Sequence, residues 1–243
     1  YSFWLNKDEV KTKNGNEITL ERTDAAFGKD ENGNEFTEWP VNSEISSRYY
    51  IKLFYKIKDE TRDSAEIGIS ADGKYQYSEL EKAILEREFY DISKPTEDYK
   101  GNQVRSEQAE SRETISNYIY DYTYEYSEPL SVMLESGVGH SLRITAFLSG
   151  TEIEKAVLIP AGNIGSYNDW LSDKKSEGAA ETDNTIFLEG EDYALKSSTT
   201  VYPISDNKSA ATSPQQAGKV LLNTVGGYHW NGVGQYIIWK VDA

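Results

Sequence analysis

Short runs in which hydrophobic and polar residues alternate recur along the chain. The clearest run is 49–57, which puts four apolar side chains on one face: Ile51, Leu53, Tyr55 and Ile57. Similar alternation follows at 65–70, 130–134, 142–148 and 152–159. Turn-forming pairs such as Asn32-Gly33 and Asp72-Gly73 separate these runs. Alternation with a period of two is typical of strands with one buried face, so the pattern predicts an all-β, antiparallel protein.

One segment departs from this pattern. Ser78 followed by Glu81 fits a capping box, and good helix formers such as Ala83 and Leu85 come next, so 78–86 is predicted to be a short helix.

After Pro160 the composition changes, and 161–183 is rich in small, polar and charged residues. A new apolar pattern begins at 186–188 and continues through 219–223 and 235–241. The sequence therefore predicts a β-sandwich module at 1–160, a linker at 161–183, and the start of a second module at 184–243. The second module is shorter than a whole sandwich. It either packs on the first, is completed by another chain, or is part of a longer protein, and the last alternative is preferred.

Composition excludes several classes of function. The formal net charge is −16, which disfavours binding to nucleic-acid phosphates. No run of apolar residues is long enough for a transmembrane helix. There are no cysteines, which removes thiol catalysis and Cys-based zinc sites. The chain begins at Tyr1 without a basic and apolar leader, and is expected to be a processed or excised segment.

Two stretches near the end of the chain are similar to carbohydrate-binding modules of families 6 and 35. They run from Ile186 through Glu189-Gly-Glu191-Asp192-Tyr193, and from Leu221 through Gly226-Gly227-Tyr228-His-Trp230 to Val241. Both halves of the chain also resemble sandwich modules attached to bacterial solute-binding proteins of sugar ABC transporters. In the first half the similar segments are 49–56, 72–77, 101–108 and 127–130.

The resemblance implies a galactose-binding-like antiparallel β-sandwich (jelly roll), with a partial second sandwich at the C-terminus. It also implies an extracellular or cell-surface location in a bacterium, sugar binding, and often calcium. By the same resemblance, Glu189 and Glu191 would contribute to a calcium site, since calcium takes 6–8 oxygen ligands. The alternative is that these carboxylates are simply a solvated part of an acidic chain.

Two aromatic clusters are candidate sugar platforms, because sugar C–H groups stack on aromatic rings. The first cluster contains Tyr122 and Tyr124, within a period-two series that runs from Tyr118 to Tyr126. The second comprises Tyr228, Trp230 and Asn231 in a Gly-rich loop. For both clusters a structural role remains an alternative: the tyrosines could cover a half-buried sheet, and the tryptophan could fold into the core.

Catalytic motifs are missing from the sequence. It contains two histidines, His140 and His229, and neither a nucleophile elbow nor a phosphate-binding loop. His140 follows Gly139 in an expected turn and is predicted to be a surface residue. The preferred function is a non-enzymatic module that binds poly- or oligosaccharides for bacterial glycan capture or sugar uptake. The alternative is a structural module that contacts other domains of a cell-surface solute-binding assembly and binds no sugar. A glycan hydrolase is a third, less favoured hypothesis.

Overall fold

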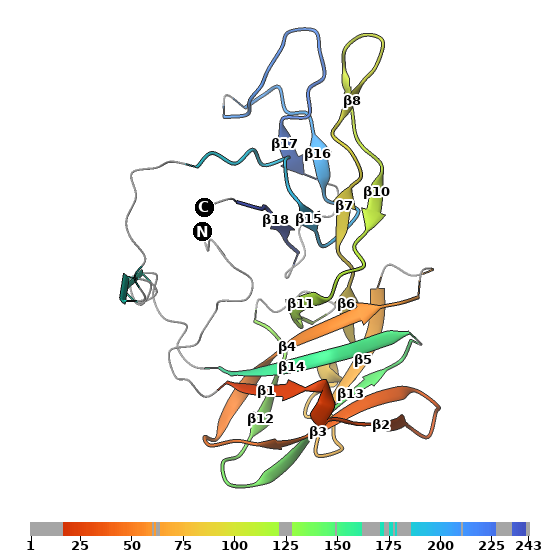
Figure 1. The fold of residues 1–243 in the computed structure, drawn as a ribbon, viewed down its shortest axis with the longest axis vertical. Helices are drawn as coiled ribbons and strands as arrows, with labels where there is room; N and C mark the ends of the chain where they lie inside the picture. The colour runs from red at the N-terminus through yellow and green to blue at the C-terminus, as the bar shows by residue number, and fades with distance from the viewer. Residues whose placement is uncertain are drawn as a thin grey trace. The chain divides into compact units, whose positions relative to one another are not determined.

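In the part of the chain that the structure describes, the regular secondary structure consists mainly of antiparallel strands, which confirms the predicted all-β fold class (Figure 1). The computed structural model describes residues 17–59, 61, 64–121, 128–148, 150–161, 171–172, 175–176, 178, 186–209, 211–226 and 235–241. The chain divides into two compact units. Unit 1 comprises 1–85 and 113–184, and unit 2 comprises 86–112 and 185–243.

One sheet of unit 1 is organised around β4 (Ser47–Ile57). On one side β4 pairs along most of its length with β14 (Thr151–Pro160), which in turn pairs with β1 (Ile18–Glu21). On the other side, two short strands share β4: β11 (Ile115–Tyr118) and β12 (Ser131–Leu134). A bulge between Ile153 and Lys155 shifts the register of β14 against β4. The inward and outward positions of the two strands therefore match on both sides of the bulge.

The second sheet of unit 1 has the order β2-β3-β13-β5-β6. Its strands are β2 (Ala26–Lys29), β3 (Glu35–Asn42), β13 (Gly139–Ala146), β5 (Ser64–Ala71) and β6 (Ala83–Glu86). Two 3-10 turns, η1 (Arg22–Asp24) and η2 (Ser78–Leu80), complete the unit.

A single apolar core joins the two sheets into a sandwich. The predicted inward residues of 49–57 are all buried, with Ile51 and Leu53 fully inaccessible to solvent. From the opposite sheet come Trp39, Ile67, Ile69, Leu142 and Ile144. The Trp39 indole nitrogen donates to the backbone oxygen of Glu21 over 2.8 Å, so this buried polar group is satisfied. The predicted antiparallel sandwich is therefore confirmed for unit 1.

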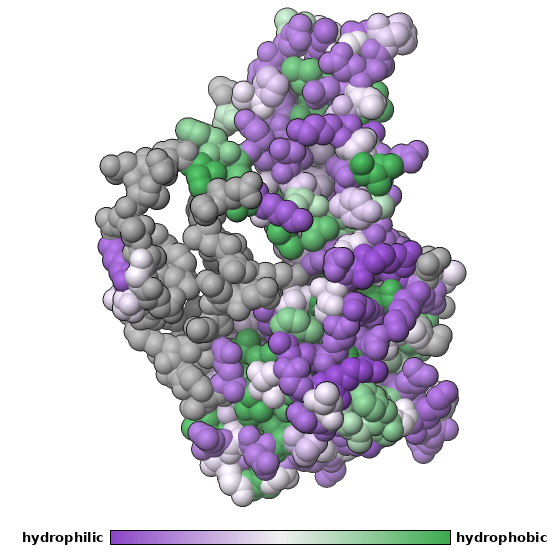
Figure 2. All heavy atoms as spheres, viewed as in Figure 1, coloured by the Kyte–Doolittle hydropathy of each residue, from purple (hydrophilic) through white to green (hydrophobic). Residues whose placement is uncertain are grey.

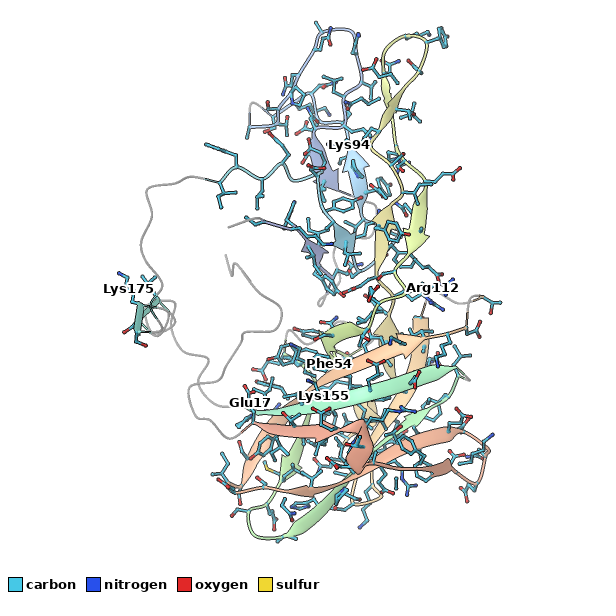
Figure 3. All side chains as sticks on the ribbon, viewed as in Figure 1. Glu17, Phe54, Lys94, Arg112, Lys155 and Lys175 are labelled. Atoms are coloured by element: carbon cyan, nitrogen blue, oxygen red, sulfur yellow. The ribbon has the colours of Figure 1, made fainter. Side chains whose placement is uncertain are left out.

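The outer face of the β4 sheet is amphipathic rather than simply polar. Phe54 on β4 lies opposite Lys155 on β14, whose ammonium nitrogen is 4.2 Å from the centre of the phenyl ring (Figure 3). Lys52 approaches the same ring at 5.3 Å. The lysine stems thus cover an aromatic ring that would otherwise expose more apolar surface.

Two hairpin turns share one sequence pattern, Asp-x-x-Gly-Asn, and one geometry. In 30–34 the Asp30 carboxylate accepts from the backbone nitrogens of Asn32 and Asn34, and Gly33 adopts φ +83°. In 98–102 the Asp98 carboxylate accepts in the same way, and Gly101 adopts φ +75°. The side-chain amides of Asn34 and Asn102 also donate to these carboxylates. The amide hydrogen bond of Asn34 is the main cause that lowers the pKa of Asp30, and the backbone and amide hydrogen bonds of Asn102 lower the pKa of Asp98. The carboxylates are therefore occupied in holding their turns.

Unit 2 contains a four-stranded sheet of order β10-β7-β15-β18 and two hairpins, β8–β9 and β16–β17. The strands are β7 (Phe89–Asp91), β8 (Thr96–Glu97), β9 (Gln103–Val104), β10 (Gln108–Glu110), β15 (Leu195–Lys196), β16 (Tyr202–Ile204), β17 (Thr224–Gly226) and β18 (Ile237–Ile238). Residues 86–112, which the sequence places in the first module, thus supply two of the four strands of this sheet. The predicted boundaries at 160 and 184 stay a prediction.

Two local expectations were wrong. The predicted helix at 78–86 is a 3-10 turn followed by β6, because Ala83 and Leu85 are both buried and their spacing fits a strand. The predicted opening strand at 186–188 is not a strand: its three side chains are 56%, 88% and 50% exposed. An apolar run without a pairing partner does not form a strand on its own.

The core predicts a clear contrast within β5. Replacing the fully buried Ile69 with Ala should lower the free energy of unfolding by about 2–5 kcal/mol, through lost burial and a residual cavity. Glu66→Ala on the same strand removes only an exposed ion pair with Lys82 and should change it by less than about 0.5 kcal/mol. Urea denaturation of both variants measures the difference. Equal effects would contradict the assignment of Ile69 to the core.

Candidate functional site

An open depression on unit 2 is lined by two segments that lie far apart in the sequence. Its volume is about 670 Å³, and its lining residues are Val104, Arg105, Ser106, Glu107, Gln108, Thr199 and Tyr202. The segments meet because β7 pairs with β10 on one side and with β15 on the other. Sheet pairing therefore builds the depression from residues just before β10 and just after β15.

Arg105 and Tyr202 form the aromatic part of the depression. The guanidinium carbon of Arg105 lies 3.9 Å from the centre of the Tyr202 ring, within the range of a cation–π contact. Among the residues that the structure describes, none accepts a hydrogen bond from this guanidinium. Arg105 is exposed, so its N–H donors are available to a ligand while its guanidinium carbon lies over the Tyr202 ring.

A buried ion pair lies next to the depression. Lys196 has no accessible surface, and its ammonium donates to Asp91 over 3.3 Å and to the Tyr193 hydroxyl over 3.0 Å. The Tyr193 hydroxyl donates to the other Asp91 oxygen over 2.9 Å. When the Gln108 side-chain amide is oriented with its oxygen toward Lys196, this oxygen accepts from the Lys196 ammonium at 2.5 Å. The amide nitrogen then donates to the Thr199 backbone oxygen. The network thus ties two residues of the depression to the core of unit 2.

Electrostatics in this network follow from burial. Burial lowers the pKa of Lys196, and the charge of Asp91 opposes that effect. Burial also raises the pKa of Tyr193, and its hydrogen bond to Asp91 raises it further. Tyr193 therefore remains protonated at neutral pH and keeps its role as a donor.

Most of the binding residues predicted from sequence lie outside the described residues. This applies to Tyr122, Tyr124, Tyr228, Trp230 and Asn231, whose roles stay predictions. The start of the tyrosine series is described: Tyr118 and Tyr120 are half-buried, while Ile119 and Asp121 between and after them are buried. Burial raises the pKa of Tyr118 to about 12, with a smaller contribution from Glu17.

Glu189 and Glu191 lie in a turn before β15, where the Asp192 nitrogen donates to the Glu189 backbone oxygen over 3.1 Å. Burial raises the pKa of Glu191, and the charges of Glu189 and Asp192 raise it further. Within the described part of the chain, no three His, Cys, Asp or Glu side chains are grouped closely enough to hold a metal ion. A calcium site at Glu189 and Glu191 therefore stays a prediction.

The sequence missed Arg105, Gln108 and Tyr202 as a group. Arg105 and Gln108 lie in a segment that resembles sugar-binding modules, yet nothing in their spacing points to Tyr202. Their proximity depends on the pairing of very short strands, which leaves no recognisable hydrophobic period.

Comparisons with known proteins give distant structural similarity only. No protein-family model matches the sequence, and the search of curated proteins finds no match. Among solved structures, a family 35 carbohydrate-binding module from Clostridium thermocellum is 13% identical, with a TM-score of 0.32; the alignment covers 60% of this chain and 98% of the module. A Podospora anserina GH26-CBM35 β-(1,4)-mannanase is 10% identical, with a TM-score of 0.34 over 60% of this chain and 28% of the mannanase.

A similar score is reached by a protein of another kind. The mosquito-larvicidal Cry4Aa toxin from Bacillus thuringiensis is 10% identical, with a TM-score of 0.34 over 60% of this chain and 24% of the toxin. Among the described residues, no helix has the length and hydrophobicity that a membrane span requires.

The ion pair predicts a non-additive mutational cycle. Lys196→Met should lower the free energy of unfolding by about 3–5 kcal/mol, because the Asp91 carboxylate loses its buried partner. The double variant Asp91→Asn/Lys196→Met should recover a large part of that loss. Urea denaturation provides the measurement, and Lys94→Met at an exposed position is the matched control (Figure 3). Strictly additive effects of the two substitutions would show that the pair does not interact.

Proposed function

We propose that this protein is a non-catalytic carbohydrate-binding module and that the depression on unit 2 binds an oligosaccharide. The observation behind this proposal is the composition of its lining. An arginine stacked on a tyrosine lies among hydroxyl, amide and carboxylate side chains around an open hollow. Sites of this kind combine a flat contact surface with a few polar groups that fix the orientation of the ligand.

Each part of the lining matches a property of sugars. Hydroxyl groups both donate and accept, and the depression offers Arg105 as donor and Glu107 as acceptor. The Ser106 hydroxyl is already engaged, because it donates to the Glu107 backbone oxygen and accepts from the Ser93 nitrogen. The Arg105 plane on the Tyr202 ring gives a stacked surface for sugar C–H groups. Hydrogen bonds to charged groups are the stronger ones, so Arg105 and Glu107 should determine specificity.

The same lining supports binding without hydrolysis. Of the described residues that form the depression, only Glu107 has a carboxylate, whereas glycoside hydrolysis typically uses two. The nearby Asp91 is engaged by Lys196 and Tyr193 and is not positioned to exchange a proton with a ligand.

The biological setting is part of the proposal and is based on the sequence resemblance. We place the protein outside a bacterial cell, or on its surface, in glycan capture or sugar uptake. Attachment to the solute-binding protein of a sugar ABC transporter and a contribution of calcium through Glu189 and Glu191 belong to the same proposal.

A second candidate function is a structural module that contacts other proteins. The observation in its favour is the apolar run Ile186, Phe187 and Leu188, whose side chains are at least half exposed. Figure 2 shows hydrophobic residues at the surface where the described chain resumes after the linker. Apolar side chains gathered at a surface are typical of interaction sites.

Binding should depend on the stacked pair. In isothermal titration of the full chain against a panel of oligosaccharides, with and without calcium, we expect Tyr202→Ala and Arg105→Ala each to weaken binding about tenfold or more. Tyr99→Ala is the matched control, since Tyr99 is a 91% exposed tyrosine on the β8–β9 hairpin of the same unit. Binding by the unmodified chain that neither variant weakens would place the sugar elsewhere, for example at Trp230. No binding to any glycan would favour the structural module.

A further inference from the structure

His140 connects two loops at one end of the unit 1 sandwich. It is the second residue of β13 and follows the turn at 135–138. Its side chain is only 8% exposed, while the residue as a whole is partly buried, so His140 lies near the surface with its ring covered. The ring is covered because it makes hydrogen bonds on both sides, toward the turn after β5 and toward the turn before β13.

On one side the ring is fixed by Asp72. The Nδ1 atom of His140 lies 2.8 Å from a carboxylate oxygen of Asp72. Asp72 is itself held: its other carboxylate oxygen accepts from the Ser141 nitrogen over 2.8 Å, and its own nitrogen donates to the Ser141 oxygen over 2.9 Å. Asp72 also adopts φ +53° in the Asp72-Gly73 turn, a conformation that Asp and Asn tolerate best among residues with a side chain. A carboxylate in this position keeps a proton on Nδ1.

On the other side, the ring has two alternative partners on one residue. The Nε2 atom lies 3.0 Å from the backbone nitrogen of Glu135 and 3.1 Å from its backbone oxygen. A neutral ring with its proton on Nδ1 accepts from the Glu135 N–H. A doubly protonated ring can no longer accept there and instead donates to the Glu135 oxygen. The two states of the ring therefore require different hydrogen bonds from the same peptide segment.

The turn that holds Glu135 has few other contacts. Residues 135–139 are all exposed. The Ser136 nitrogen donates to the Ser46 hydroxyl over 2.9 Å, and the Gly137 nitrogen donates to the Ser43 backbone oxygen over 3.3 Å. A change in the partner of Nε2 thus affects a segment that these hydrogen bonds join to the 43–46 loop.

We propose that His140 is a proton-controlled hydrogen-bond switch, in which protonation exchanges the Glu135 N–H for the Glu135 carbonyl as the partner of Nε2. The charged groups that face the ring from the elements around it are Asp72 and Glu135. The hydrogen bond to Asp72 raises the pKa of His140, and the same contact lowers the pKa of Asp72. The switch would therefore operate above the ordinary imidazole pKa of 6.5.

The sign of the effect on stability follows by linkage. The pKa of His140 is higher in the folded protein than in the unfolded chain. Its contribution to the free energy of unfolding is therefore fully present below pH 6.5 and is lost as pH rises through the pKa of the folded protein. The protonated state is thus the more stable one, and the neutral state is reached on the alkaline side of the transition.

The test follows the ring and the turn together. The chain has two histidines, so the full-length His229→Gln variant, labelled with ¹⁵N, leaves His140 as the only imidazole to titrate. We expect both ring nitrogens to be protonated at acidic pH and Nε2 alone to lose its proton as pH rises. Over the same transition, the Glu135 amide resonance should shift and its protection from hydrogen exchange should increase. Deprotonation at Nδ1, or a Glu135 amide unaffected by the transition, would overturn the proposal.

Asp72→Asn in the same background provides the control. Asn tolerates positive φ, so the turn should fold. Its single amide oxygen can accept from the Ser141 N–H or from Nδ1–H, but not from both as the Asp72 carboxylate does. Removing the charge should move the pKa of His140 toward 6.5 and abolish the fall in thermal midpoint that the parent shows as pH rises through the transition. A pKa unchanged by the substitution would show that Asp72 does not control the switch. These readouts involve unit 1 alone and are independent of sugar binding.

Discussion

The fold depends on the alternation of side chains along β4. This strand pairs with three others and buries Ile51, Leu53 and Tyr55 against the opposite sheet. A shift by one residue would turn Lys52 and Lys56 toward the apolar core and turn the apolar side chains away from it. Because β14 follows β4 along most of its length, the same constraint sets the register of the longest pairing in unit 1. The bulge near Lys155 is where β14 adjusts to remain in phase.

Local periodicity explains how much of this could be predicted. The runs at 49–57 and 142–148 are long enough for their buried faces to be recognised, and the structure confirms both. The helix expected at 78–86 was predicted because Ala83 and Leu85 have good helix propensity. The prediction was wrong because the pairing of this segment with β5 outweighs that propensity. Propensity is a weak guide where a segment is short and an open sheet edge is available.

The candidate site was beyond such reasoning. Arg105 and Tyr202 come from different segments, and only the pairing of β7 with both β10 and β15 brings them together. Similarly, the burial of His140 depends on Asp72, a turn residue whose partner lies far along the chain. The predicted aromatic clusters consist of residues that are neighbours along the chain, because a single sequence shows no contacts between distant segments.

The buried Lys196 explains how unit 2 can adopt one strand register although its strands are very short. β15 has two residues, and its ladder pairing with β7 consists of one residue pair, Lys196 with Phe89. A pairing this short contains little information about register. The ammonium of Lys196 must reach Asp91, and a slip of one residue would turn it away and leave a buried charge uncompensated. We therefore attribute the register of this sheet, and with it the shape of the depression, more to the ion pair than to backbone hydrogen bonding.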